Sequence, residues 1–198
     1  MTGPPGAHPA MQLAREAQRL YDPPMPSGPT PSPPWTEPLQ RLWQRVQAHP
    51  FEVPGDALDF TRRLARDHRW TLPYTRGAVA EYRRFCFLAV SAPGRPATPS
   101  EEVDEVWHAH LTYTRDDWDR WCAALGRSLH HDPTRGGPAE AQRFRAQYAD
   151  TLARYEALFG LPPPEYWPAA HVRFGPPRFC VLDRQAGIRR LAAALRLA

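Results

Sequence analysis

The chain has 198 residues, which is enough for one domain with a substantial core and short for two. It carries 25 basic and 21 acidic residues, a net charge of +4, and every basic residue is Arg. Lys and Asn are absent and Ile occurs once, a bias typical of GC-rich coding, so the Arg excess is a poor signal of nucleic-acid binding and we do not expect a nucleic-acid partner.

The cysteines and the apolar segments indicate a reducing compartment. Cys86, Cys122 and Cys180 are odd in number and far apart, which argues against a disulfide framework and for buried, inert thiols. The first residues lack an apolar signal segment, and the longest apolar run, Phe85–Val90, is far too short to span a membrane. We therefore expect a cytoplasmic protein without a transmembrane segment.

Residues 1–34 are rich in Pro and Gly and are predicted to be disordered, with a short helix possible over Met11–Tyr21. Pro23–Pro34 excludes helix and favours polyproline II. Such a segment serves either as a spacer or as a ligand for a protein partner, and the spacer is the commoner use.

Helical periodicity without strand-like alternation runs from Trp35 to Gly160 and predicts five main helices. They are expected over residues 36–49, 56–70, 75–90, 98–125 and 139–159. In the second helix Leu58, Phe60 and Leu64 are expected to face inward, and the Leu72–Pro73 pair is read as a break. Thr98 to Glu101 forms a capping box with Thr98 as the N-cap.

The fold class is therefore all-α: a single helical-bundle domain over residues 35–168, with a Pro-rich segment before it. Residues 169–198 form a C-terminal extension, with an extended return over His171–Leu182 and a short basic amphipathic helix over Asp183–Ala198. That helix is expected either to contact a protein partner or an anionic surface, or to pack back on the domain.

The ionisable side chains concentrate in the fourth helix and the loop after it. At about 100° per residue, Trp107 and His110 share the core face, while Asp104 and His108 lie one turn apart on the polar rim. His108 and His110 are then about 200° apart, so they cannot ligate one metal on a regular helix. This separates the His-Ala-His spacing from motifs whose histidines are four residues apart.

A break in this helix is predicted between Thr112 and Arg115, because Thr114 followed by Arg115-Asp116-Asp117 is a second N-cap signal. The break would let the loop that contains His130, His131 and Asp132 fold back over the first helical piece. Gly126 is expected to end the second piece.

The resulting cluster permits two interpretations. Its members are Asp104, His108, His110, His130, His131 and Asp132. They suit a divalent metal such as Zn, Fe or Mn, with His108, His110 and His131 as ligands and Cys122 as a less favoured one. Alternatively, His110 is a core histidine, and hydrogen bonds within the pairs Asp104–His108 and His130/His131–Asp132 hold the loop in place. This second interpretation is favoured, because clusters of ionisable residues are often structural.

The motif Asp104-Glu105-Val106-Trp107-His108-Ala109-His110, with Trp121-Cys122, Gly126 and His130-His131-Asp132-Pro133, resembles the glycine-rich domain-containing protein-like family. The resemblance extends over about Pro99–Pro168 and places Asp104, Trp107, His108 and His110 at motif positions, with His130 and His131 alongside. It implies an intracellular helical module without an assigned reaction, and an RNA-binding role has been suggested for plant members. The glycine-rich tail of the family is missing here, so a role tied to it does not carry over.

Three functions follow as hypotheses. The first is a binding or scaffold module whose His/Asp/Trp cluster stabilises a loop and a pocket. The second is a metal-dependent enzyme, most plausibly a hydrolase, with Asp104 or Asp132 as general base. The third is RNA binding through Arg-rich faces and exposed aromatic side chains. The first leads, because the helix geometry permits a metal only if the break is present.

Overall fold

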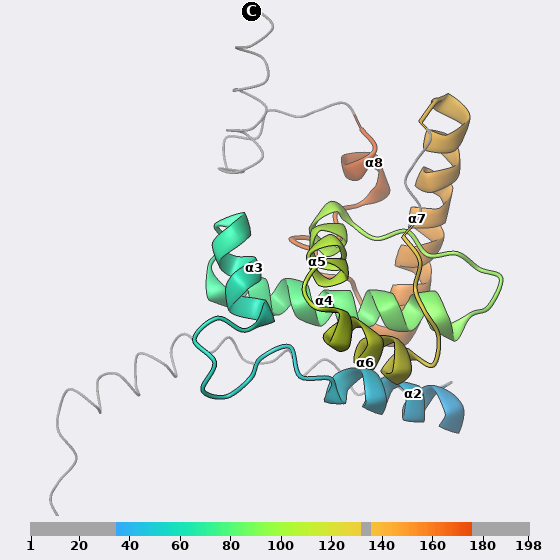
Figure 1. Ribbon diagram of the computed structural model, residues 1–198. Helices are drawn as coiled ribbons and strands as arrows, with labels where there is room; N and C mark the ends of the chain where they lie inside the picture. Colours follow the sequence, from blue (N-terminus) through green and yellow to red (C-terminus); the bar gives the residue numbers. More distant parts are fainter. Residues whose placement is uncertain (1–34, 132–135, 176–198) are drawn as a thin grey trace, which may run out of the picture.

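The structure, a computed structural model, describes residues 35–131 and 136–175 (Figure 1). Within these ranges the regular structure is helical and contains no strand, which confirms the all-α fold class. The predictions made for residues 1–34, for Asp132 and for residues 176–198 lie outside the described residues. No helix in the described ranges combines the length and apolarity needed to cross a membrane.

The first two described helices begin at their capping residues. Helix α2 covers Glu37–Ala48 and follows Thr36 as predicted. Helix α3 covers Phe60–His68 and begins four residues later than predicted, because the Asp59 carboxylate accepts a hydrogen bond from the backbone N–H of Arg62 and acts as its N-cap. Leu58 therefore lies before α3 and is exposed, so the prediction that it faces inward is wrong.

Helix α4, Leu72–Ser91, forms the centre of the domain and packs against α2, α3, α5, α6 and α7. It runs across the middle of Figure 1. The predicted break between the second and third helices is present, but it lies at residues 69–71 and not at Leu72–Pro73. Thr71 caps α4, and Pro73 fits its first turn because the N–H it lacks has no partner there. Its apolar later half buries Tyr82, Phe85 and Leu88 in the core, which fits its central place.

The predicted break in the fourth helix is confirmed. Helix α5 covers Glu101–Leu111 and helix α6 covers Arg115–Leu125, with Gly126 at its end. The N–H of Asp117 donates to Thr114 Oγ1, so the second cap forms as expected. The cap of α5 is Ser100 rather than Thr98, whose side-chain hydroxyl donates to Gln147 and whose backbone N–H donates to Thr151, both on α7.

Helix α7, Pro138–Phe159, stands against the end of α4, and the chain then wraps back through residues 161–168. Trp167 in this wrap is buried and its indole N–H donates to Glu81 on α4, which also accepts from Tyr155 on α7. The short helix α8, Ala170–Arg173, occupies part of the stretch predicted as an extended return, so that prediction is wrong there.

Candidate functional site

The predicted histidine cluster divides into two separate groups. The interior cluster consists of His49, His110 and Asp117, and the surface cluster of Asp104, His108 and His131. His108 and His110 leave α5 on different sides, as the helix geometry predicted. A single metal centre with His108, His110 and His131 as ligands therefore does not correspond to the structure, because His110 points into the core away from the other two.

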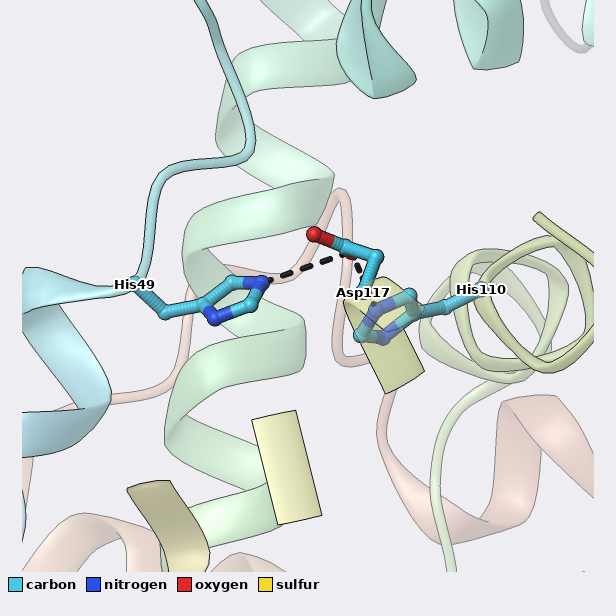
Figure 2. Close-up of side chains that lie close together, drawn as sticks. All are labelled: His49, His110 and Asp117. Carbon is cyan, nitrogen blue, oxygen red and sulfur yellow. Dashed lines mark hydrogen bonds and ion pairs between the residues drawn. The ribbon is translucent and has the colours of Figure 1, made fainter. Parts of the chain in front are cut away.

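The interior cluster joins three elements, as Figure 2 shows. His49 directly follows α2, His110 lies in the last turn of α5, and Asp117 lies in the first turn of α6. Asp117 Oδ2 is 2.9 Å from His110 Nε2 and 3.4 Å from His49 Nε2. All three residues are buried, and His110 has no exposed surface at all.

The hydrogen bonds of this cluster define the tautomer of His110. Burial raises the pKa of Asp117, but hydrogen bonds from His110, His49 and Arg120 outweigh it and hold that pKa well below its usual range. An ionised carboxylate only accepts, so the Nε2–H of His110 donates to it. Burial lowers the pKa of His110, with the Asp117 contact opposing, so a neutral imidazole accepts at Nδ1 from the Tyr82 hydroxyl at 3.0 Å.

Aromatic rings enclose the interior cluster. The Phe51 ring lies 5.0 Å from that of His110, and the Trp121 ring lies 4.9 Å from that of His49. Apolar walls weaken competition from water, so the polar contacts inside are stronger than the same contacts on the surface.

The surface cluster pins the loop after α6 onto α5. His131 Nε2 is 3.0 Å from Asp104 Oδ1, and His108 Nδ1 is 3.7 Å from Asp104 Oδ2. The His131 ring also packs edge-on against Trp107 with the ring centroids 4.6 Å apart. The prediction that this loop folds back onto the first helical piece is thus confirmed for Asp104 and His108, which it contacts, and is wrong for His110, which it does not reach. His130 is exposed and belongs to neither cluster.

A pocket of about 350 Å³, the Trp107 pocket, opens beside the surface cluster. Its walls come from the segment before α5, from α5, from the loop after α6, and from α7 and α8. They include Pro99, Asp104, Trp107, His131, Phe144 and Arg173. Two N–H donors of these lining residues, Trp107 Nε1 and Arg173 Nη1, are buried and have no hydrogen-bond partner within the described residues.

Sequence reasoning missed His49, Asp117 and Arg173. His49 lies 68 residues from Asp117, so only the tertiary fold brings them together. The one local signal was the position of Asp117 three residues after Thr114, where an acidic side chain commonly faces the helix start. Arg173 lies in the stretch that we expected to be extended.

The cysteines take no part in either cluster. Cys86 is buried and burial raises the pKa of its thiol, in agreement with the prediction of an inert residue. Cys122 is half-buried on α6 and belongs to neither group, so the suggestion of a thiolate ligand does not correspond to the described arrangement. Cys180 lies outside the described residues.

Comparison with known proteins supports the family resemblance. The chain is 26% identical over 120 residues to glycine-rich domain-containing protein 1 of Arabidopsis thaliana, which is 59% of this chain and 14% of that protein. The chain thus spans about a seventh of the length of this relative. No protein-family model and no solved structure matches the chain.

Proposed function

We propose that this helical domain is a binding module that holds a small ligand with an apolar body and a carboxylate in the Trp107 pocket. The observation that carries the proposal is the pair of buried, unpartnered donors, Trp107 Nε1 and Arg173 Nη1, among the residues that line one pocket. A buried donor without an acceptor costs roughly 1–3 kcal/mol, and a ligand oxygen would remove that cost once a small side-chain movement opens the donor to the pocket.

The shape and chemistry of the pocket support a compact ligand. A volume of about 350 Å³ lies in the range of small-molecule sites. Phe144 and Phe174 supply apolar walls, and Arg173 supplies the cation that a carboxylate prefers. The Arg173 guanidinium is already positioned by stacking 4.7 Å over the Tyr148 ring.

In this account the surface cluster supports the pocket rather than reacting. Asp104 connects His131 to α5, and the His131 ring packs against Trp107. These contacts hold the Trp107 indole in its position in the pocket wall. The exposed fraction of Trp107 is 7%, which leaves its ring little freedom to turn toward another acceptor.

The test is a titration of the full chain with benzoate, phenylacetamide and phenyl phosphate, followed by the indole N–H signals in ¹H–¹⁵N spectra. We expect benzoate to shift the Trp107 signal, identified by its loss in Trp107→Phe, with a Kd of about 1 mM or tighter. Arg173→Gln should weaken binding about 10-fold or more, because it removes the charge-assisted hydrogen bond. Arg115→Gln, an exposed Arg on α6, is the matched control and should bind normally.

The proposal fails if all three probes leave the Trp107 signal unmoved. It also fails if Arg173→Gln and Arg115→Gln bind benzoate equally well. A stronger response to phenyl phosphate than to benzoate would replace the carboxylate by a phosphate ester as the ligand class.

A further inference from the structure

The interior cluster brings three side chains that can ligate a metal to one point in the core. One potential ligand atom from each of His49, His110 and Asp117 lies within 4.8 Å of the other two, and the three residues come from the end of α2, from α5 and from α6. Figure 2 shows both imidazoles directed toward the carboxylate that lies between them. Two imidazole nitrogens and one carboxylate oxygen are a ligand set that first-row divalent metals prefer.

The spacing of the atoms fits metal ligation as well as hydrogen bonding. Ligands at about 2.0–2.1 Å from a tetrahedral ion are about 3.3 Å apart. The two Asp117 distances, 2.9 and 3.4 Å, lie on either side of that value. By contrast, 3.4 Å is long for a hydrogen bond to a carboxylate. A hydrogen bond therefore explains the contact of Asp117 with His110 well and its contact with His49 poorly.

The surrounding contacts resemble those that orient metal ligands. Tyr82 Oη lies 3.0 Å from His110 Nδ1, where it can accept a hydrogen bond from Nδ1–H once Nε2 is occupied by a metal. Arg120 donates to Asp117 Oδ1 at 2.9 Å, which leaves Oδ2 as the oxygen directed at the two imidazoles. His110 and Asp117 thus each have a partner at the atom that does not face the centre.

Burial shields this point from solvent. His49, His110 and Asp117 are all less than a tenth exposed, so a bound ion would exchange with water slowly, and the low local dielectric would strengthen its attraction to the Asp117 carboxylate. Three protein ligands leave one coordination position, which water commonly fills in such sites.

We propose that His49, His110 and Asp117 bind one zinc ion, which ties the end of α2 to α5 and α6. The site is independent of the Trp107 pocket, since it shares no residue with it. Because metal binding to such ligands is coupled to folding, the loaded chain is more stable than the metal-free chain.

The experiment uses the full chain, stripped with a chelator and titrated with zinc by calorimetry. We expect one equivalent to bind and the melting temperature to rise. Tyr82→Phe should weaken binding about 10- to 100-fold, and Asp117→Asn, which keeps the side-chain shape, by more than about 100-fold. His108→Ala is the matched control, because it removes a histidine from the same helix on its other side, and it should bind as the unmodified chain does.

A second measurement needs no variant of the interior cluster. The tautomer of His110 should switch from Nε2–H to Nδ1–H on zinc addition, and the ¹⁵N signals of two imidazoles should move together, while that of His131 stays. Variants His108→Ala and His131→Ala identify the signals of these two residues. The proposal is overturned if the unmodified chain binds no stoichiometric zinc, if Asp117→Asn binds within about 10-fold of it, or if His131 is the imidazole that responds.

Discussion

Replacing Asp117 with Ala removes the acceptor that two buried imidazoles share, and we expect a large loss of stability in the metal-free protein. The His110 Nε2–H loses its only charged partner, which costs roughly 1–3 kcal/mol for a buried donor. The longer contact to His49 adds about 1 kcal/mol, at the low end of the same range. Loss of an acidic residue from the first turn of α6 adds about 0.5 kcal/mol.

The sum, about 2.5–4.5 kcal/mol, is a large share of the roughly 5–15 kcal/mol that stabilises a typical domain. The assay is urea unfolding in the presence of a chelator, followed by Trp fluorescence and far-UV circular dichroism. An unchanged slope with urea would show that the free energy of unfolding, and not the unfolded state, has changed.

Asp116→Ala is the control for this prediction. Asp116 is the preceding residue, its side chain is exposed, and it pairs only with Arg120, so its removal should change the free energy of unfolding by less than about 0.5 kcal/mol. If Asp117→Ala costs no more than Asp116→Ala, the two imidazoles do not depend on this carboxylate and the reasoning is refuted.

Three further predictions concern pH, the loop and the packing of α4. The pKa of Asp117 is lower in the folded chain than in the unfolded chain, so its contribution to stability is complete above the unfolded pKa of about 3.9 and is lost as the pH falls toward the folded value. The difference in unfolding free energy between the unmodified chain and Asp117→Asn should therefore become smaller below about pH 4. A difference that stays constant would contradict this. Asp104→Asn should speed hydrogen exchange and proteolysis around His131, because it weakens the contact that holds this loop on α5. The Asp104–His131 pair is partly exposed, so the free energy of unfolding should change by less than about 1 kcal/mol. Unchanged exchange would show that Asp104 does not hold the loop in place. Gly77→Ala should destabilise the domain by about 1–3 kcal/mol, because the new Cβ would lie 2.0 Å from Tyr166 Oη. Elsewhere in a helix the same substitution normally stabilises by about 1 kcal/mol. A rise in melting temperature would refute this prediction.

The features that the sequence predicts well are those fixed by neighbouring residues. The break at Thr112–Thr114 was visible because Thr114 and the acidic residues after it favour a new helix start over continuation. The opposite facing of His108 and His110 follows from helix geometry alone, and burial of His110 confirms it. Gly126 ends α6 in a left-handed conformation, as its position indicated.

The features that were missed depend on tertiary contacts. Thr98 and Ser100 are both able to cap α5, and the contacts of Thr98 with Gln147 and Thr151 on α7 decide between them. The Leu72–Pro73 pair is equally compatible with the end of one helix and the start of the next, because Pro is tolerated in a first turn. His49 gives no sequence signal of its own, since its partners lie on α5 and α6.

The His-Ala-His motif contributes to two different places, with His110 in the interior cluster, which we propose binds zinc, and His108 in a surface cluster beside a pocket. The most direct measurement is anomalous X-ray diffraction at the zinc edge from crystals of the full chain grown with one equivalent of zinc. We predict a single anomalous peak between His49 Nε2, His110 Nε2 and Asp117 Oδ2. A peak beside Asp104 and His131 with none in the interior, or no bound zinc at all, would contradict the account.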